Sequence, residues 1–341
     1  MKKYSLFVFL TILSFLSFAQ QNINYSFGDE RFEMAKEFFQ KGQYNLAYPL
    51  LKELQQQIRE TDRVNQPIKV EEIEYYTTVS ALIQNESRAE YDAQQYIAIT
   101  KNNARVQMMN FHLAEYYFRK EQFTDAVALY EAANIANLSN TEIATAKFHQ
   151  GYAYFTMKQF NQAKPLFNTI RQSKDDPNYT DANYYYGFIA FRDRNYTEAL
   201  ESFRVVENAP AYEATVPYYI AQIYYVQGRK DEAIKYAESK IGAGKAQYYD
   251  LELKQLLGHA YFEKKQYAKA LPYLEDYVTR SDKVRKEDLY ELSYAYYQVP
   301  NYNKAIEGFK QLSGKEDSVS QHAMYLLGDS YLKTAQKSAA R

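Results

Sequence analysis

The sequence predicts an all-α fold, an extended solenoid built from antiparallel helix pairs. Three observations carry this prediction. The chain has only 11 Gly and 8 Pro in 341 residues, too few for the turn density of an all-β protein. An alanine recurs at spacings of 34 to 42 residues. Other positions repeat in register with it, at intervals of three and four residues that are typical of helices.

The N-terminus reads as a targeting segment. Lys2 and Lys3 precede an apolar run from Leu6 to Phe18, and Ser17 and Ala19 place small residues where a signal peptidase cleaves. Residues 1–19 are therefore expected to be a cleaved secretory signal, followed by a linker over residues 20–27 and then the helical array over residues 28–341. This predicts an exported protein of the periplasm or cell envelope. An uncleaved N-terminal anchor is the alternative.

Composition excludes several classes of function. Removing the leader leaves 39 basic against 42 acidic side chains, a balance that argues against nucleic-acid binding. The chain has no Cys, which excludes disulfides, thiolate metal sites, a cysteine nucleophile and a lipid-modified cysteine after the leader. With 46% hydrophobic and 24% charged residues, the chain is expected to fold into a packed core.

Each element of the array follows from the repeated positions. The aligned alanines, expected near the start of each second helix, are Ala47, Ala89, Ala126, Ala163, Ala199, Ala233, Ala270, Ala305 and Ala340. Twelve residues earlier, in the first helix, stand the small residues Ala35, Thr77, Ala114, Gly151, Gly187, Ala221, Gly258, Ser293 and Gly328. Most copies carry aromatic residues nine and three residues before the alanine and a bulky apolar residue four after it. Small residues let two helices approach closely while the larger side chains fill the space around the crossing.

This spacing resembles the tetratricopeptide repeat (TPR), and "LLGHAYFEKKQYAKALPYL" from Leu256 is a close copy. With the alanine at position 20 of a 34-residue frame, the copies begin near residues 28, 70, 107, 144, 180, 214, 251, 286 and 321. The resemblance implies a right-handed superhelix of about eight full repeats and a truncated ninth. The chain departs from the family pattern in having no Trp, and in Ser80 and Glu86 of copy two, where aromatics belong.

Two further features bear on the helices. Copy nine stops at Arg341, so either residues 321–334 cap the array or the native chain continues. Pro49, Pro165 and Pro272 share position 22, where an interior proline would ordinarily break a helix. The second helices of these copies are expected to begin at or just before Ala47, Ala163 and Ala270, so that each proline lies about five residues into its helix.

The sequence holds no evident catalytic or metal site. His112 and His149 share one frame position in adjacent copies. We interpret them as helix-surface residues rather than a metal pair, because no carboxylate or thiolate completes a ligand set. Carboxylates are scattered over predicted solvent-facing helix surfaces without the pairing that acid–base catalysis needs. We therefore expect no enzyme activity, no cofactor and no metal.

Binding is the function that the resemblance implies. In TPR proteins the first helices line a concave groove and contact partners from positions 2, 5, 9, 12 and 13. Aromatic residues with nearby arginines have the composition of a protein or peptide interface. Carried onto this chain, the candidate partner-binding residues are Phe118, Arg119, Tyr152, Phe155, Tyr184, Phe188, Phe191, Arg192, Tyr218, Tyr225, Phe262, Tyr290, Tyr294 and Tyr297. Packing of the position-12 aromatics against the next helix is the alternative interpretation.

Three functions remain open on the sequence. The first is a non-enzymatic scaffold of the cell envelope that binds a protein or peptide partner in the aromatic groove. The second is the N-terminal sensor or adaptor part of a longer signalling protein. The third is a glycan- or peptidoglycan-binding module, because tyrosine rings stack on sugars as well as on side chains. None of these involves nucleic acid, and none requires a membrane span after the leader is removed.

Overall fold

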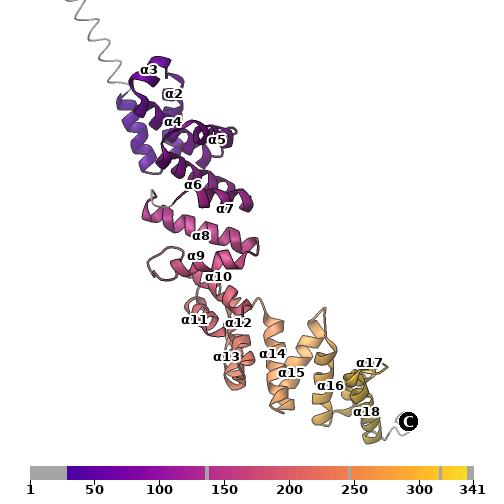
Figure 1. The fold of residues 1–341 in the computed structure, drawn as a ribbon. Coiled ribbons are helices and arrows are strands. Elements are labelled where there is room, and N and C mark those ends of the chain that lie inside the picture. The colour runs from indigo at the N-terminus through magenta and orange to yellow at the C-terminus, as the bar shows by residue number, and fades with distance from the viewer. Residues whose placement is uncertain (1–28, 135–137, 245–246, 315–316, 336–341) are drawn as a thin grey trace, which may run out of the picture. The chain divides into compact units, whose positions relative to one another are not determined.

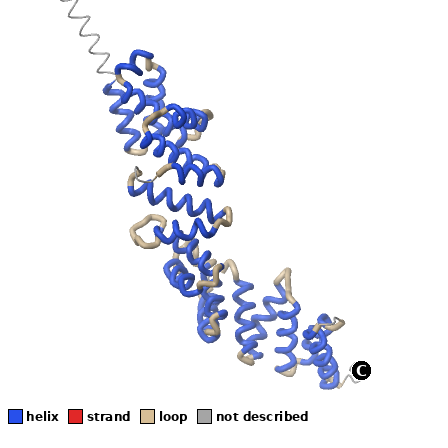
Figure 2. The backbone as a smooth tube through the Cα atoms, in the orientation of Figure 1, coloured by secondary structure: helices blue, strands red, loops and turns tan. Residues whose placement is uncertain are grey.

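The computed structural model describes residues 29–134, 138–244, 247–314 and 317–335. The predicted leader and linker lie outside these residues. Helices joined by short loops make up the described chain (Figures 1 and 2), which confirms the all-α class. The chain divides into two compact units, residues 1–170 (unit 1) and 171–341 (unit 2). None of the described helices combines the length and apolar character needed to cross a membrane.

Within each unit, first and second helices alternate along the chain. Unit 1 begins with helical residues 29–40 and continues with α2 (Tyr44–Gln56), α3 (Glu60–Asn65), α4 (Pro67–Ile83), α5 (Ala89–Ile99), α6 (Asn103–Arg119), α7 (Phe123–Ala132), α8 (Asn140–Thr156) and α9 (Phe160–Ile170). Helices α2 and α3 both pack on α4, each helix from α4 to α8 packs on the next one, and the first helices α4, α6 and α8 also contact one another in sequence. This is the stacking of helical hairpins that the repeats predicted.

Unit 2 repeats the same arrangement. Its helices are α10 (Tyr179–Arg192), α11 (Tyr196–Val206), α12 (Val216–Val226), α13 (Lys230–Gly242), α14 (Asp250–Glu263), α15 (Tyr267–Arg280), α16 (Lys286–Gln298), α17 (Tyr302–Leu312) and α18 (Ser318–Lys333). The first helices α12, α14, α16 and α18 contact one another in order, and each second helix lies against its own first helix and the next one. The hairpins therefore share one continuous core within the unit.

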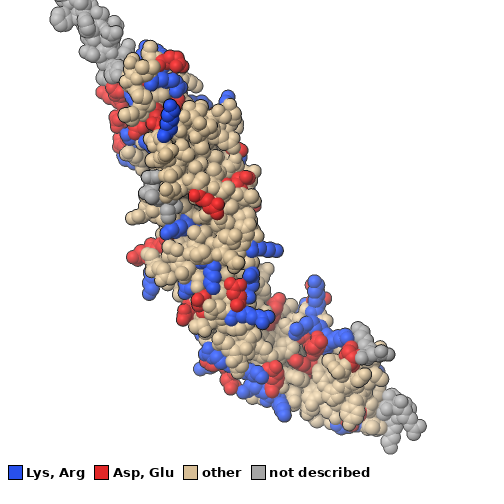
Figure 3. Space-filling view, in the orientation of Figure 1, with Lys and Arg blue, Asp and Glu red and all other residues tan. Residues whose placement is uncertain are grey.

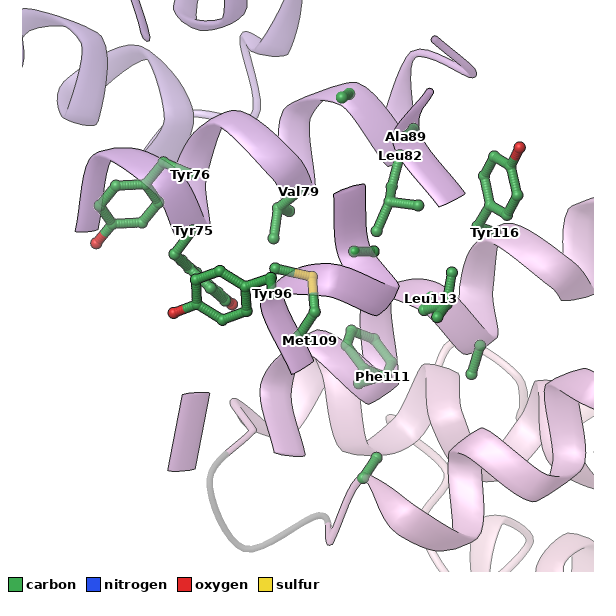
Figure 4. Packing of buried hydrophobic residues seen from close by; sticks show 14 of the residues in the cluster. Tyr75, Tyr76, Val79, Leu82, Ala89, Tyr96, Met109, Phe111, Leu113 and Tyr116 are labelled. Carbon is green, nitrogen blue, oxygen red and sulfur yellow. The ribbon is translucent and has the colours of Figure 1, made fainter. Parts of the chain in front are cut away.

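The small residues predicted at the helix crossings lie there. A Cβ added to Gly151 would come within 3.1 Å of the Phe167 ring, and one added to Gly187 within 3.0 Å of the Phe203 ring. Both rings are fully buried. In unit 1, side chains of α4, α5 and α6, such as Leu82, point into one packed interior (Figure 4). The glycine and the bulky residue sixteen positions later thus form the contact that holds each hairpin closed.

Most of the described hairpins turn through one residue in the left-handed backbone region. This residue is Gly42, Glu121, Lys158, Arg194, Gly228 or Lys265, with φ between 58° and 76°. It lies five residues before the aligned alanine in these copies. In copy two the corresponding residue is Asn85, four residues before Ala89. In that copy the alanine is one residue closer to the left-handed turn residue and is the first residue of α5, which accounts for the irregular sequence register there.

Alanine at Gly228 is expected to destabilise unit 2 by about 1 kcal/mol. A side chain in the left-handed region is strained even though open space surrounds this glycine. Gly242→Ala is the matched control, because Gly242 ends α13 without a positive φ and also has open space around it. Urea unfolding followed by circular dichroism measures both variants. Equal stability of the two would contradict a conformational role for Gly228.

Two local features differ from the expectation. The short helix α3 lies between α2 and α4, where the sequence predicted only a connection, and none of its residues is buried. The second helices with internal prolines begin three residues before the aligned alanines, at Tyr44, Phe160 and Tyr267. Each proline is thus the sixth residue of its helix and is solvent-exposed. Its missing N–H removes one hydrogen bond near the open end, where the ring clash costs least.

Candidate functional site

An aromatic pair closes the turn of most hairpins. The ring at position 12, near the end of the first helix, meets the ring five residues later edge to face, with centroids 5.2–6.1 Å apart. The pairs are Phe39–Tyr44, Phe118–Phe123, Phe155–Phe160, Phe191–Tyr196, Phe262–Tyr267 and Tyr297–Tyr302. Such a pair contributes about 0.5–1.5 kcal/mol beyond its buried area. The position-12 rings predicted for partner binding therefore also stabilise their own hairpins, and they are half-buried.

In unit 1 the structure brings two of the predicted residues together. The Phe118 ring stacks on His149, with centroids 4.0 Å apart and planes 11° from parallel, and meets Tyr152 edge to face at 5.9 Å. The His149 Nδ1 lies 2.9 Å from a Glu115 carboxylate oxygen. His149 was not among the candidate residues. Its position one turn from predicted aromatics on α8 was the signal available in the sequence.

The other two predicted residues of unit 1 lie elsewhere. Arg119 donates a hydrogen bond of 2.9 Å from Nη2 to the backbone carbonyl of Leu82, at the end of α4. Phe155 pairs with Phe160 at the turn of its own hairpin. The cation expected beside the aromatic groove is thus engaged with the backbone of the preceding copy.

The two aligned histidines have different surroundings. The His112 Nε2 lies 3.1 Å from the Tyr75 hydroxyl, and burial lowers the pKa of His112 to about 4. His149 pairs with Glu115 instead. Throughout the described ranges, no group of three or more His, Asp or Glu side chains is placed to hold a metal ion.

In unit 2 the predicted residues of α10 and α12 gather around tyrosines that the sequence reading missed. Tyr184 stacks on Tyr212, with centroids 4.1 Å apart, and Phe188 and Phe191 both contact the Tyr219 ring, at 5.9 and 5.2 Å. Tyr219 is buried, whereas its predicted neighbours are half-buried.

Inter-repeat tyrosines complete this group. Tyr218 lies 4.7 Å from Tyr249, whose hydroxyl is 3.2 Å from that of Tyr219. Tyr212 and Tyr249 belong to the connections just before α12 and α14. A tyrosine immediately before a first helix was the sequence signal for them. Arg192, predicted as a nearby cation, forms an ion pair of 3.3 Å with Asp193.

Farther along unit 2, a contiguous group of aromatic side chains spans α14, α16 and α18. We call it the Tyr294 cluster, because the Tyr294 ring lies 5.7–6.4 Å from each of Phe262, Tyr267, Tyr290, Tyr297 and His322. The Tyr290 hydroxyl lies 2.6 Å from the His322 Nδ1. Tyr325, one turn farther on α18, is parallel to His322 and is 71% exposed. Phe262, Tyr290, Tyr294 and Tyr297 were predicted for this surface, and Tyr267, His322 and Tyr325 were not.

Tyr225 lies apart from the ring clusters. Burial raises its pKa, and a hydrogen bond to the Glu263 carboxylate raises it further. Glu263 in turn forms an ion pair of 2.7 Å with Lys230. On the face shown in Figure 3, Lys and Arg side chains of unit 2 are interspersed with Asp and Glu, without a field of one sign.

A buried ionic network lies beneath the Tyr294 cluster, between α14 and α16. Asp288, with a fully buried side chain, accepts hydrogen bonds from Gln255 (2.8 Å) and from the Arg285 guanidinium (2.9 Å) and lies 3.0 Å from the His259 Nε2. The His259 Nδ1 contacts Glu291.

The network shifts the pKa values of its members. Burial alone would lower the pKa of His259, but the hydrogen bonds to Asp288 and Glu291 outweigh it and raise the value to about 9. Burial acts in the opposite direction on Asp288, yet hydrogen bonds from His259, Arg285 and Gln255 hold the pKa of that carboxyl well below its usual range. Near neutral pH the pair is therefore an imidazolium and a carboxylate.

Within each unit, the stacked helical hairpins with their aromatic first-helix surfaces form an α-solenoid. Residues 148–214 and 251–283 each match a tetratricopeptide repeat model. These two regions of the α-solenoid are therefore similar to tetratricopeptide repeats, as the sequence resemblance predicted. Such repeats form protein-interaction modules, and the family is generally non-catalytic.

Comparison with solved structures returns other helical-repeat proteins at low similarity. MamA (AMB-1) is 17% identical, with 53% of this chain and 94% of MamA covered and a TM-score of 0.44. PilW, a type IV pilus biogenesis factor, is 20% identical, with coverages of 64% and 98% and a TM-score of 0.42. PilF of Pseudomonas aeruginosa is 13% identical, with coverages of 65% and 98% and a TM-score of 0.45. No curated protein sequence matches the chain.

Proposed function

We propose that this protein is a non-enzymatic scaffold that binds a partner polypeptide on the first-helix surface of unit 2. The observation that carries the proposal is the Tyr294 cluster. Apart from Tyr267 on α15, its rings come from three successive first helices, at positions that contact partners in TPR proteins, and they continue to the 71% exposed Tyr325. A contiguous group of partly exposed aromatic side chains is the usual centre of a protein interface.

The charges near this surface support a polypeptide partner over a nucleic acid. Acidic side chains at the neighbouring contact positions include Glu252, Glu287 and Asp329, and Asp329 is paired with Lys333 at 2.8 Å. Mixed charges around an aromatic centre match the polar rim of a protein interface. A polyanion would meet carboxylates here rather than a basic field.

Site-specific crosslinking tests the proposal. A photoreactive phenylalanine analogue at Tyr325 is expected to crosslink a polypeptide in cells, and Tyr290→Ala in the same chain is expected to reduce the yield at least several-fold. The matched control carries the analogue at Tyr91, an exposed tyrosine on the second helix α5. Equal crosslinking at both positions, or none at Tyr325, would contradict a first-helix binding surface.

We also propose, from residues 1–19, that the chain is exported and acts in the cell envelope. The basic start, the apolar run and the small residues at Ser17 and Ala19 support this. Purification from the native cell followed by N-terminal sequencing tests it. A mature chain that begins at Gln20 supports export with cleavage, whereas a chain that retains Met1 contradicts cleavage and leaves the uncleaved N-terminal anchor; recovery in the cytoplasmic fraction contradicts export.

The glycan-binding alternative rests on the same rings. A sugar ring can stack on the face of a tyrosine ring, and Tyr325 is 71% exposed. Cosedimentation of the purified protein with cell-wall sacculi distinguishes the two partners. Binding that is lost in Tyr325→Ala would replace the polypeptide proposal with the glycan one.

A further inference from the structure

A hollow of about 600 Å³ opens between the second helices α15 and α17, over the first helix α16. Its lining includes Glu275 from α15, Leu289, Leu292 and Tyr296 from α16, and Gly308 from α17. None of the predicted partner-binding residues contributes to it. The hollow therefore belongs to the second-helix side of unit 2, separate from the Tyr294 cluster.

The preceding copy shows what fills the equivalent space. There, position 23 is Tyr273, whose ring is parallel to that of Tyr261, with centroids 6.0 Å apart and planes 7° from parallel. The Tyr273 hydroxyl donates to the Glu238 carboxylate at 3.1 Å, and the Tyr261 hydroxyl donates to the same oxygen at 2.7 Å. A phenol thus lies against a tyrosine of its own hairpin and is held by an acid of the preceding second helix.

Copy six uses the same position in a similar way. Its position 23 is Tyr236, which meets Tyr224 edge to face at 6.1 Å and donates its hydroxyl to Glu207 at 2.7 Å. Two successive copies of unit 2 therefore fill this space with a tyrosine ring bonded to a glutamate.

Copy eight has the tyrosine and the glutamate that contact this ring in copy seven, but it lacks the ring itself. Tyr296 and Glu275 stand at the positions of Tyr261 and Glu238, whereas Gly308 stands at the position of Tyr273. The Lys304 Nζ lies between them, 2.6 Å from the Glu275 carboxylate and 3.1 Å from the Tyr296 hydroxyl. The hollow lies beside Gly308, and its lining includes Tyr296 and Glu275, the equivalents of the two groups that contact the Tyr273 ring one copy earlier.

We propose that the hollow beside Gly308 receives the tyrosine side chain of a partner polypeptide. The ring lies against Tyr296 and the leucines of α16, and the hydroxyl donates to Glu275, as that of Tyr273 donates to Glu238 one copy earlier. The exposed Glu307 in the lining favours a segment that carries Lys or Arg near this tyrosine. The site is a second interaction surface, independent of the first-helix surface.

Titration with N-acetyltyrosinamide tests the proposal on the full chain. The methyl NMR signals of Leu289 and Leu292 are expected to shift saturably. N-acetylphenylalaninamide, which lacks the hydroxyl, is expected to bind about tenfold more weakly, because it donates no hydrogen bond to the Glu275 carboxylate. A tyrosine probe that gives no saturable shift, or that binds no better than the phenylalanine probe, would overturn the proposal.

Two variants locate the binding. Ser293→Gly with Gly308→Tyr gives copy eight the glycine and tyrosine of copy seven and fills the hollow; the serine must also change because its hydroxyl would collide with a Cβ at position 308. This variant is expected to keep the wild-type helical content and to lose the probe shifts. Glu275→Gln leaves the hollow open and is expected to weaken the tyrosine probe about tenfold. Binding that persists unchanged in either variant would contradict the site.

The variant Tyr325→Ala distinguishes a failure of this proposal from a failure of the proposed function. It alters only the first-helix surface and is expected to leave the probe shifts at Leu289 and Leu292 unchanged. Loss of those shifts in Tyr325→Ala would place the probe on the Tyr294 cluster and overturn the second site.

Discussion

Asp288→Ala is expected to destabilise α14 and α16 by about 3–5 kcal/mol, the cost of breaking a buried ion pair by removing one partner. The Asp288 side chain is 0% exposed. Its loss leaves the His259 Nε2 and the Gln255 amide without this acceptor, while the His259 Nδ1 keeps its contact with Glu291. It also removes the capping interaction in which Asp288 accepts the Arg285 backbone N–H at 3.1 Å.

Hydrogen–deuterium exchange of the amides of α14 and α16 measures this local loss, because repeat arrays can open hairpin by hairpin. Asp282→Ala is the control, because Asp282 is an exposed acid in the connection just before α16. Protection factors in α14 that fall equally in both variants, or in neither, would show that the network contributes little.

The same network gives unit 2 a defined dependence on pH. His259 has a pKa raised from 6.5 to about 9, so its stabilising contribution is complete below about 6.5 and is lost as the pH rises through 9. Asp288 has a lowered pKa, so its contribution is present above the ordinary carboxyl range and is lost in acid. In the wild-type protein, exchange protection in α14 is expected to fall between pH 7 and about 9.5. In His259→Gln this fall is expected to be smaller. An unchanged slope in that variant would contradict a protonated His259.

Gly258→Ala is expected to cost about 1–3 kcal/mol by overpacking the crossing of α14 and α15. A Cβ on Gly258 would come within 2.7 Å of the Leu274 Cγ, and Leu274 is fully buried. Copy six resolves the same conflict with an alanine at both positions, Ala221 and Ala237.

A double-mutant cycle isolates this contact. Leu274→Ala alone removes packing and is expected to cost about 2–5 kcal/mol. Gly258→Ala with Leu274→Ala together should cost less than the sum of the single changes by about 1–3 kcal/mol, because the added methyl then occupies the space that the leucine leaves. Urea unfolding measures all three variants. Strict additivity would mean that the two positions do not compete for the same space.

The hairpin core was predictable because its contacts lie at fixed sequence distances. Gly187 and Phe203 meet across one hairpin, sixteen residues apart, and the same separation recurs in most copies. Helix α3 was not predictable from this pattern, since residues Glu60 to Asn65 bury nothing and carry no apolar periodicity. Its presence depends on local capping at Arg59 and Asp62 rather than on the repeat.

The sequence indicated which residue types form the candidate site, but not which of these side chains contact one another. The position-12 aromatics appeared in the sequence as a groove lining, yet the left-handed turn residue brings each one onto the ring five residues later. Of the tyrosines before α12 and α14, Tyr212 lies at the end of the 34-residue frame and Tyr249 outside it, and both join the site only through helix stacking. Asp288 and His259 resembled ordinary surface charges until packing of α16 on α14 enclosed them.

The phenol–glutamate contacts also give the protein an intrinsic absorbance signal for the separation of its hairpins. The chain has 37 Tyr and no Trp, so tyrosine dominates its near-ultraviolet absorbance. Phenols that bond to an acid of the preceding second helix, such as Tyr154 with Glu131 and Tyr273 with Glu238, have pKa values raised to about 12 by burial and the adjacent carboxylate. Their ionisation is therefore linked to separation of neighbouring hairpins. An alkaline absorbance titration reads the opening of these junctions without any added label.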